Sequence, residues 1–597
     1  MKEKKIIKTW QAMGRMIRFQ LWPFLFTTFA RSVDLLGWLI PGLAAREFFQ
    51  LITDKATTRF DLRMLIILLI AGGITHIFGS FFKIRKDAFF TGHVRALLQN
   101  HMLKQILKQP GARSLPESPG EALSRFQGDV DEFCQAILLT SDLVANLLFI
   151  TVAVIIMMNI SPLITLVAVI PLLTVVAVAS IATNRVQRYR NEMRKTSAAA
   201  AGFIAETFDA VQAIKVADAD NRVVEHFAAL NEKRRKTALK DRLFTEVLDS
   251  ILRNAGNLGV GIVLLMTPQL LRDSRVTLGD LTLFVYYLGM LTMFMSSIGP
   301  FWARYTQAGV SLSRMQYLMQ GAPPDELVAH EPLFIDDNPA PVLPASPPAG
   351  QGLEELQIKA LCFHYPDSGC GIENINLKIR RGELIVITGR IGSGKSTLLR
   401  TLQGLLPRDS GEILWNGKTI EDPSVFFVPP NSAYTAQVPR LFSYSLRENI
   451  LLGAAEKSEK LEKAIYQAVL EKDLVTLEKG LDTLVGVRGV NLSGGQMQRT
   501  AAARMFHHNP ELFIMDDLSS ALDVETEQLL WSRLFGCRDE NNNNLYTCLV
   551  VSHRRSVLQR ADQILVLRNG RIYAQGKPGD LLGNCDELEK AVAGKSE

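Results

Sequence analysis

The sequence predicts two fold classes in one chain: an all-α membrane domain with six spanning helices, followed by an α/β domain. Six apolar stretches, each at least about 20 residues long, lie in the first half of the chain and are long enough to cross a bilayer. The segment 322–352 is dense in proline and lacks apolar periodicity, as linkers do. The remainder has the composition of a soluble α/β sequence. We therefore place the domains at 1–321 and 353–597.

The six predicted spans are separated by gaps that alternate between short and long. The spans lie near 21–50, 62–82, 133–159, 161–185, 243–272 and 279–310. The gaps after the second and fourth spans are polar, have a helical pattern and are roughly 50 to 60 residues long. Cations follow or close these two spans, namely Lys83, Arg85, Lys86, Arg185, Arg188 and Arg190. The positive-inside rule then puts the N-terminus, both long gaps and the C-terminal domain in the cytoplasm.

Several ionisable residues lie inside the apolar spans, where a charge is costly. The clearest are Arg31, Asp34, Asp142, Glu246, Asp249 and Arg253. The spacing puts Arg31 with Asp34, and Asp249 with Arg253, on one helix face. These residues either line a substrate path or neutralise one another near a span end that water reaches, and they do not identify a substrate.

Length, charge and cysteine usage narrow the class of protein further. A chain of 597 residues exceeds the size of a single hydrophobic core. The net charge of +6 is modest, and the early lysines and arginines fit a cytoplasmic membrane face, so we expect no nucleic-acid partner. The six cysteines have no spacing suited to zinc or to a disulfide framework. The first apolar stretch is too long for a signal peptide and no cleavage pattern follows it, so we expect a retained span.

A phosphate-binding pattern follows the strand-like run 383–388. It consists of Gly389, Arg390, Ile391, Gly392, Ser393, Gly394, Lys395, Ser396 and Thr397. Glycines let backbone N–H groups approach phosphates at a helix N-terminus. Lys395 supplies positive charge to the β- and γ-phosphates, and the Ser396 hydroxyl can bind Mg²⁺. The alternative is a glycine turn with an incidental lysine, which the strand before and the helix after disfavour.

Two later strands also end in candidate site residues. The run LFIMDD, 512–517, places Asp516 where a metal-binding acid is needed, although an Asp there can also cap a helix. The run LVVS, 549–552, delivers His553, which can hydrogen-bond a γ-phosphate or an attacking water. A lone histidine is often structural, but this one follows a strand of the same sheet, which favours the functional reading.

The segment Leu492, Ser493, Gly494, Gly495 and Gln496, before a helical pattern, resembles the signature of ATP-binding cassette (ABC) proteins. An ordered set of residues around it is also similar to that family: Tyr365, the phosphate loop, Gln437, the 512–517 strand end, the 519–523 segment ending in Asp523, and His553. With six preceding spans, the chain resembles a half-transporter of the type IV ABC exporter family over nearly its whole length. In the membrane half, residues 120–125 with Asp129 and Asp131, and the stretch 206–227, resemble the two cytoplasmic coupling regions.

The resemblance implies an α/β P-loop NTPase fold for the ABC domain, with ATP and Mg²⁺ as its ligands. Tyr365 would stack on adenine, and the metal would be held by Ser396, Gln437 and Asp516. Catalysis would fall to Asp517, His553 and Gln437. In this family each ATP lies between the phosphate loop of one cassette and the signature of another, here the segment 493–496 with Asp523. A second ABC half-transporter subunit is therefore an implied partner.

The chain departs from the family at two places. The residue after the metal-binding Asp is usually Glu, the general base, and here it is Asp517, whose shorter side chain withdraws the carboxylate by about 1.5 Å. With an unmodified signature, this resembles the degenerate subunit of a heterodimeric exporter, although retention of His553 keeps a homodimer possible. Before the signature, Leu484 and Val487 stand where many exporters have glutamates, which puts contacts of that loop with a coupling region in doubt.

These observations favour an ATP-hydrolysing transporter subunit whose own ATP site is slow because of Asp517. We expect it to lie in the cytoplasmic membrane of a bacterium, in contact with membrane lipid. We expect export of a small-molecule, lipid or peptide substrate. The alternatives are an importer of the siderophore type, since direction is not encoded in the motifs, and a regulatory subunit that senses ATP. A soluble cassette ATPase of repair or translation is excluded by the spans.

Overall fold

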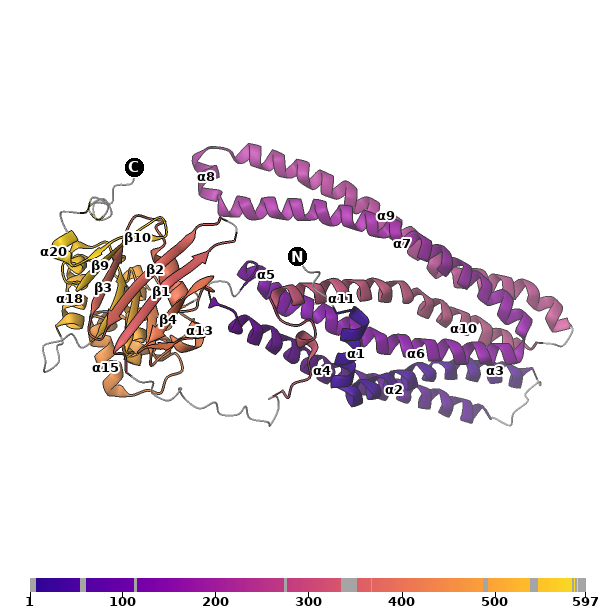
Figure 1. The fold of residues 1–597 in the computed structure, drawn as a ribbon. Coiled ribbons are helices and arrows are strands. Elements are labelled where there is room, and N and C mark those ends of the chain that lie inside the picture. The colour runs from indigo at the N-terminus through magenta and orange to yellow at the C-terminus, as the bar shows by residue number, and fades with distance from the viewer. Residues whose placement is uncertain are drawn as a thin grey trace. The chain divides into compact units, whose positions relative to one another are not determined.

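The computed structural model describes residues 7–53, 61–111, 115–272, 276–333, 352–366, 368–486, 492–536, 546–581, 585 and 588. The chain divides into two compact units, one of residues 1–106 with 115–333 and the other of residues 107–114 with 334–597. The first unit is built of helices and the second of two sheets with flanking helices (Figure 1). The predicted fold class, an all-α membrane part followed by an α/β part, is confirmed.

The first unit is dominated by four helices of more than 30 residues. Its elements are α1 (Thr9–Phe19), α2 (Leu21–Gly37), α3 (Leu39–Ile52), α4 (Leu62–Lys108), α5 (Pro119–Ser124), the π-helix η2 (Arg125–Asp129), α6 (Val130–Ile160), α7 (Pro162–Asp209), α8 (Val211–Val216), α9 (Asp220–Arg272), α10 (Leu278–Ser296), α11 (Ile298–Leu318) and the 3₁₀ turn η3 (Glu326–Val328). The polar gaps predicted to be helical are so: α4, α7 and α9 run on beyond the apolar spans.

Five helical segments of the described residues are long and apolar enough to cross a membrane. They are Leu21–Ile52, Leu62–Lys108, Pro119–Ile160, Asp220–Met266 and Leu278–Leu318. The predicted fourth span lies in α7, where Pro162–Pro171 is a shorter apolar helical stretch among the described residues. The observed helices are therefore consistent with the six predicted spans.

The first and last spans are each broken into two helices, where continuous ones were predicted. The breaks lie at Trp38 and Ser297, whose N–H groups donate to Leu35 O (3.0 Å) and Phe294 O (3.1 Å), one residue short of the α-helical partner. Prolines explain both breaks. Pro41 and Pro300 have no N–H to offer the carbonyl four residues earlier, and those carbonyls belong to the last residues of α2 and α10.

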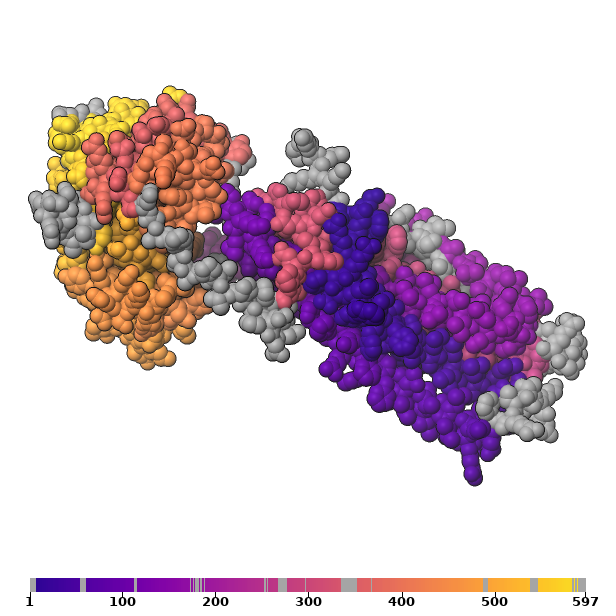
Figure 2. All heavy atoms as spheres, turned by 60° about the horizontal axis from the view of Figure 1, so that its bottom comes forward, coloured from indigo at the N-terminus to yellow at the C-terminus, as the bar shows by residue number. Residues whose placement is uncertain are grey.

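Helices far apart in the sequence pack together in the first unit. One buried cluster contains Phe90, Leu97 and Phe133, and another contains Phe149, Phe284 and Tyr287. In the space-filling view, indigo N-terminal residues lie against rose-coloured ones from near residue 300, as the contact of α1 with α11 requires (Figure 2). Helices α3 and α10 meet at Gly42, where an added Cβ would lie 2.5 Å from a Tyr287 ring carbon.

The second unit contains a mixed six-stranded sheet and an antiparallel four-stranded sheet. Its strands are β1 (Glu355–His364), β2 (Gly371–Arg380), β3 (Leu384–Thr388), β4 (Ser410–Trp415), β5 (Lys418–Thr419), β6 (Ser432–Thr435), β7 (Leu512–Asp516), β8 (Thr547–Val551), β9 (Gln563–Arg568) and β10 (Arg571–Gly576). Its helices are α12 (Lys395–Leu402), α13 (Pro423–Phe426), α14 (Leu446–Leu451), α15 (Ser458–Gln467), α16 (Glu471–Thr476), η4 (Gly480–Asp482), α17 (Gly494–His508), α18 (Val524–Phe535), α19 (Arg555–Leu558) and α20 (Pro578–Leu581).

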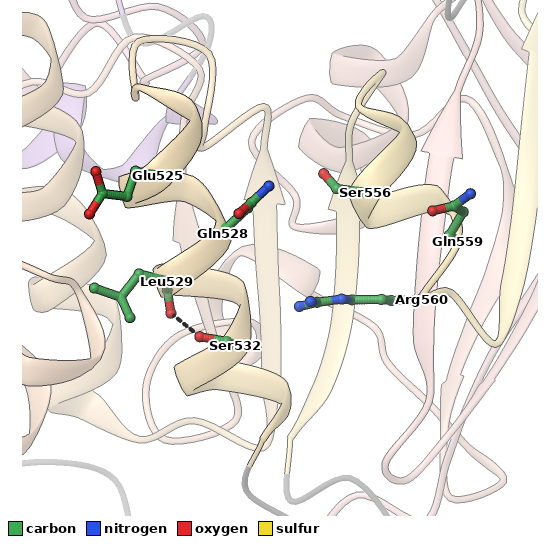
Figure 3. A pocket seen from close by; sticks show the side chains of 7 residues that line it. All are labelled: Glu525, Gln528, Leu529, Ser532, Ser556, Gln559 and Arg560. Atoms are coloured by element: carbon green, nitrogen blue, oxygen red, sulfur yellow. Dashed lines mark hydrogen bonds between the residues drawn. The ribbon is translucent and has the colours of Figure 1, made fainter.

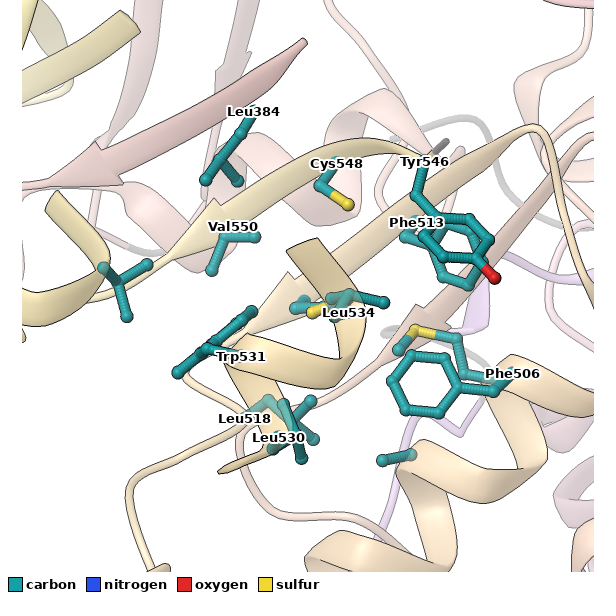
Figure 4. Close-up of a cluster of buried hydrophobic side chains, with 14 of the residues drawn as sticks. Leu384, Phe506, Phe513, Leu518, Leu530, Trp531, Leu534, Tyr546, Cys548 and Val550 are labelled. Carbon is teal, nitrogen blue, oxygen red and sulfur yellow. The ribbon is translucent and has the colours of Figure 1, made fainter. Parts of the chain in front are cut away.

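The order of the strands brings the predicted site residues to one edge. The larger sheet runs β10-β9-β3-β8-β7-β6, and all its neighbouring pairs except β10 with β9 are parallel. Its central strands β3, β7 and β8 are buried on both faces, as their continuous apolar runs predict. One face packs on a core that includes Leu384, Phe513 and Trp531 (Figure 4). Parallel strands end at the same edge, and the segments carrying Gly389, Gln437, Asp517 and His553 follow β3, β6, β7 and β8 there.

Candidate functional site

The phosphate-binding pattern forms a strand, a loop and a helix, as predicted. The loop leaves β3 at Thr388 and ends at Gly394, the N-cap of α12. Gly389, Gly392 and Gly394 all have positive φ, which side chains rarely adopt. A Cβ on Gly389 would also lie 2.2 Å from Leu567 O. The backbone N–H groups at the start of α12 therefore form a cradle that only glycines permit.

Lys395 folds back onto this loop. Its Nζ donates to Gly389 O and Arg390 O, both at 2.7 Å, and more weakly to Ser393 Oγ at 3.4 Å. Burial lowers the pKa of Lys395, while Asp516 and Asp517 oppose that shift. These hydrogen bonds place Lys395 Nζ over the cradle, where phosphate oxygens can replace the carbonyls as acceptors.

Asp516 and Ser396 form the candidate magnesium site. The Ser396 hydroxyl donates to Asp516 Oδ1 at 3.1 Å, and Tyr434 OH donates to Oδ2 at 3.4 Å. Asp516 is almost fully buried at the end of β7. A hydroxyl and a carboxylate are oxygen ligands of the kind Mg²⁺ prefers, and Mg²⁺ in such sites takes the rest from phosphates and water. No cluster of three or more His, Cys, Asp or Glu suited to a metal occurs among the described residues.

Asp517 lies beside Asp516 in a strained backbone position. Its φ is +52°, and its N–H donates to Val551 O at 3.1 Å. Burial raises the pKa of Asp517, Asp516 raises it further, and Arg554 and a hydrogen bond from the Gln437 side chain partly offset this. Gln437, predicted as a metal ligand and a catalytic residue, is thus engaged with Asp517 in this structure.

His553 lies at the end of β8, next to the phosphate loop. Its Nδ1 is 3.3 Å from Thr388 Oγ1, the last residue of β3. Burial lowers the pKa of His553, and the charge of Lys395 lowers it further. A neutral imidazole at this place can exchange hydrogen bonds with a phosphate or a water.

The lowered pKa of His553 predicts a loss of stability in mild acid. Below its ordinary pKa of 6.5 the unfolded chain binds a proton that the folded chain resists, so unfolding becomes easier as pH falls from 6.5 towards the folded pKa. We expect His553→Gln to flatten the fall of the thermal unfolding midpoint between pH 7.5 and 5.5. An unchanged pH slope in this variant would contradict the assignment.

Tyr365 follows β1 and packs edge-on against Phe363, with ring centroids 4.9 Å apart. Its N–H donates to Cys370 O at 2.8 Å. The ring is half-buried in the second unit, with Phe363 as its support. An aromatic ring held this way suits stacking on a base, as predicted for Tyr365.

The signature residues begin α17 and have partners within their own chain. Ser493 is the N-cap: its Oγ accepts from Gln496 N at 3.2 Å, and Gln496 Oε1 accepts from Ser493 N at 2.9 Å. Gln496 Nε2 also donates to Asp473, which Arg499 holds with two hydrogen bonds of 2.7 and 2.8 Å. Ser493 and Gly494 are exposed, so the helix N-terminus is presented to solvent.

The 519–523 loop is fastened from both sides. Gln498 of α17 donates to Ser520 Oγ at 2.7 Å and accepts from Ala521 N at 3.0 Å. Arg554 donates to Ser519 O at 2.8 Å and pairs with the buried Glu527. Asp523, predicted to bind nucleotide, is exposed and caps α18 by accepting from Thr526 N at 2.9 Å.

Three positioning residues of this site were missed by sequence reasoning: Tyr434, Gln498 and Arg554. Tyr434 contacts Asp516, whereas Gln498 and Arg554 secure the 519–523 loop. Their nearness in sequence to Gln437, the signature and His553 is the only signal that singles them out. The contacts themselves join segments more than 20 residues apart, which no local pattern reveals.

Removing the Gln498 side-chain bonds is expected to weaken the second unit. Gln498→Leu leaves the Ala521 N–H without its partner, which costs about 2 kcal/mol of unfolding free energy. Gln528→Leu on the exposed face of α18 is the matched control, with an expected change below about 0.5 kcal/mol. Urea titration of both variants measures the difference, and equal losses would contradict the assignment.

A hollow of about 620 Å³ lies away from these residues, between α18 and the segment that starts with α19. Its walls are Glu525, Gln528, Leu529, Ser532, Ser556, Gln559 and Arg560 (Figure 3). None of the predicted site residues lines it. Within the predicted phosphate loop, Ile391 is 99% exposed.

The charged residues of the first unit form a network between three helices. Arg31 of α2 donates to Asp34 at 2.6 Å, as its spacing predicted, and lies 3.1 Å from Asp142 of α6. Asp34 also contacts His76 of α4, and Lys83 of α4 lies 3.5 Å from Asp142. Glu246 pairs with Arg242 at 2.7 Å. The Arg253 side chain lies outside the described residues, as does Val487 near the signature, whereas Leu484 is exposed.

Comparison with known families accounts for both halves of the chain. The family model of the ABC transporter transmembrane region matches residues 24–295, and the family model described as ABC transporter matches residues 372–520. Together the two matches cover more than two thirds of the chain. The chain belongs to the ABC transporter family. This ABC transporter is a multi-pass membrane protein with its ATP-binding unit on the cytoplasmic side.

Curated relatives agree with this ABC transporter assignment, and a solved structure has the same fold. The chain is 31% identical over 365 residues to the probable multidrug resistance ABC transporter ATP-binding/permease protein YheI of Bacillus subtilis, covering 61% of this chain and 58% of that protein. It is 27% identical over 559 residues to the leukotoxin translocation ATP-binding protein LktB of Mannheimia glucosida, covering 91% and 74%. The fold matches a bacterial Atm1-family ABC exporter with ATP bound at a TM-score of 0.74 and 20% identity, covering 97% and 99%.

Proposed function

We propose that this ABC transporter chain is one subunit of an ATP-driven exporter in the cytoplasmic membrane of a bacterium. The observation that carries the proposal is the assembled phosphate site, in which Lys395 covers a glycine cradle and Ser396 meets Asp516, in a chain that also has a helical membrane unit. A nucleotide site fused to spanning helices is suited to driving transport with ATP.

Different residues of the cassette bind the phosphates of ATP and promote its hydrolysis. Backbone N–H groups at the start of α12 and the charge of Lys395 bind the β- and γ-phosphates. Mg²⁺, when bound to Ser396 and Asp516, neutralises charge on the phosphates. Asp517, oriented by Gln437, accepts the proton of the attacking water, and His553 orients that water or the γ-phosphate.

Two copies of such a cassette complete each site. Ser493, Gly494 and Gly495 present a hydroxyl and N–H groups at the N-terminus of the 15-residue helix α17, which suits an anionic phosphate. ATP bound to the partner's phosphate loop would supply that phosphate and would then hold the two cassettes together. Closure and release would move the membrane units between inward and outward states.

The partner we propose is a second, different half-transporter that carries Glu at the position of Asp517. The shorter carboxylate stands about 1.5 Å further from the water, so this chain's own site hydrolyses slowly while its signature serves the partner. The retained His553 supports the alternative of a homodimer with a repositioned water. Fast ATP hydrolysis by the purified chain alone would favour the homodimer.

The direction and substrate class rest on the relatives. YheI is named for multidrug resistance and LktB for leukotoxin translocation, which supports export of a small or lipophilic compound, a lipid or a peptide. The competing proposals are an importer with this fold and a regulatory subunit that senses ATP. ATP-dependent uptake of a labelled compound panel into inverted vesicles tests the direction: accumulation inside supports export, and loss from preloaded vesicles contradicts it.

Lys395→Ala is expected to weaken ATP binding by about tenfold, the effect of losing one charged contact with phosphate. Lys395→Arg is the control, because it keeps the charge but not the shape of the ammonium. Binding of a fluorescent ATP analogue to the full chain measures both variants. Unchanged affinity in the alanine variant would contradict the assigned phosphate site and leave the membrane assignment intact.

A further inference from the structure

Helices α7 and α9 form a long antiparallel pair whose register is defined by two contacts (Figure 1). The Tyr189 and Phe244 rings lie 5.5 Å apart, edge to face, and the hydroxyls of Thr196 and Thr237 lie 2.7 Å apart. Residues 185–195 of α7 therefore lie level with the part of α9 where its polar segment gives way to its apolar span. The basic segments of the two helices overlap at this level, with 191–195 of α7 beside 238–242 of α9.

The basic band around this level carries more formal positive charge than the whole chain. It comprises 185–195 and 232–242, with eleven cations, Arg185, Arg188, Arg190, Arg194, Lys195, Lys233, Arg234, Arg235, Lys236, Lys240 and Arg242, against Glu192, Glu232 and Asp241. Its formal charge of +8 compares with +6 for all 597 residues. Counting Glu246, which pairs with Arg242, still leaves +7.

A groove of about 430 Å³ opens within this band. It is lined by Tyr189, Lys240, Leu243, Phe244 and Val247. Lys240 is exposed at one end of it, and no carboxylate partner of Lys240 occurs among the residues that the structure describes. The groove thus joins a free ammonium to an aromatic and aliphatic wall.

The aliphatic wall continues along α9 into the predicted span. Leu239, Leu243, Val247 and Ile251 recur every four residues and are 50%, 57%, 58% and 48% exposed. That spacing puts them in one stripe along the helix. A ligand with a negative head near Lys240 and a long apolar tail matches both ends of this surface.

We propose that the groove between α7 and α9 binds an anionic phospholipid of the cytoplasmic leaflet. Its phosphate contacts Lys240, and one acyl chain lies along Leu243 and Val247. Basic clusters next to the cytoplasmic end of spanning helices attract anionic lipids. An aromatic ring such as that of Tyr189 is favoured at the membrane interface. A free phosphate would use only the charge, and a nucleic acid would leave the apolar stripe unpaired.

The positive-inside rule accounts for the sign of the band but predicts no particular site. If the attraction were diffuse, any lysine of the band would matter equally. A site in the groove instead makes Lys240 count more than a lysine outside it. Lys195, exposed on α7 within the same band and absent from the groove lining, is the matched comparison.

Titration of the full chain in detergent with spin-labelled phosphatidylglycerol tests the proposal, with phosphatidylcholine as the zwitterionic reference. We expect saturation at one tightly held phosphatidylglycerol per chain. Lys240→Gln should weaken it about fivefold and Lys195→Gln less than twofold. Val247→Asn, at an exposed position, should also weaken phosphatidylglycerol and leave the affinity for inorganic phosphate unchanged.

Four results would overturn the proposal. Equal losses in Lys240→Gln and Lys195→Gln would show diffuse attraction. Equal affinity for phosphatidylcholine would remove the role of charge. Competition by inorganic phosphate at millimolar concentration, with no effect of Val247→Asn, would identify a free anion as the ligand. A nucleic-acid oligomer that displaces the lipid stoichiometrically would also contradict it.

Discussion

Asp517→Glu is expected to raise ATP hydrolysis by the purified chain by about a hundredfold. A carboxylate misplaced by about one ångström costs a rate factor of this order, and the added methylene restores about 1.5 Å of reach. The carboxyl group already has the other features of a general base: a pKa raised by burial and by Asp516, and a hydrogen bond from Gln437. Phosphate release at saturating ATP in detergent or nanodiscs measures the effect.

The backbone at Asp517 makes a control necessary. Its φ of +52° is tolerated better by Asp than by Glu, so part of the gain can be lost to strain. ATP affinity of the variant, measured separately, reports whether the site is intact. Asp517→Asn should be slower than the natural chain. A natural chain that is already fast, or a variant that binds ATP normally without gaining rate, would contradict the proposed slow site.

Arg31→Met is expected to destabilise the first unit by about 3 to 5 kcal/mol. Arg31 donates to Asp34 at 2.6 Å, and the Asp34 side chain is fully buried, so its loss leaves a buried carboxylate with His76 as its remaining partner. Loss of one partner from a buried pair is costly because the remaining charge is then stabilised neither by its partner nor by water. Denaturant unfolding in detergent micelles, followed by tryptophan fluorescence, measures the loss.

Two further variants isolate the cause. Arg15→Met breaks the Arg15–Asp325 pair in the same unit, whose side chains are 40% and 63% exposed, and should cost less than about 1 kcal/mol. Arg31→Met combined with Asp34→Leu removes both charges and should recover most of the stability. A double variant as unstable as Arg31→Met alone would show that Arg31 acts through Asp142 or through packing instead.

The sequence predicts the elements of this protein better than the contacts between them. Apolar length locates the spans, and the prolines at 41 and 300 explain, after the fact, the breaks in the first and last of them. Asp34 and His76 pair across two helices although they are 42 residues apart in the sequence, and the residues around each give no sign of this pairing. Burial of a charge depends on such partners, which tertiary packing alone decides.

The candidate site shows the same division. Gly389, Lys395, Ser396 and Asp516 come together because a strand, a loop and a helix are encoded locally and parallel strands share an edge. Ser493 and Asp523 were predicted from a resemblance to bind nucleotide, and in this chain both cap helices. The pattern Ser493-x-x-Gln496 is a capping box, so the helix-capping role of Ser493 could be predicted from the sequence alone.

The two hydrogen bonds of Gln498 have a consequence for communication across a pair of cassettes. They join the helix that begins with the signature to the loop that ends at Asp523, so neither can shift alone. If the signature faces one nucleotide and that loop approaches the other, a conformational change at either nucleotide is transmitted to the other site through the single amide side chain of Gln498. A slow subunit would then still set the timing of its fast neighbour.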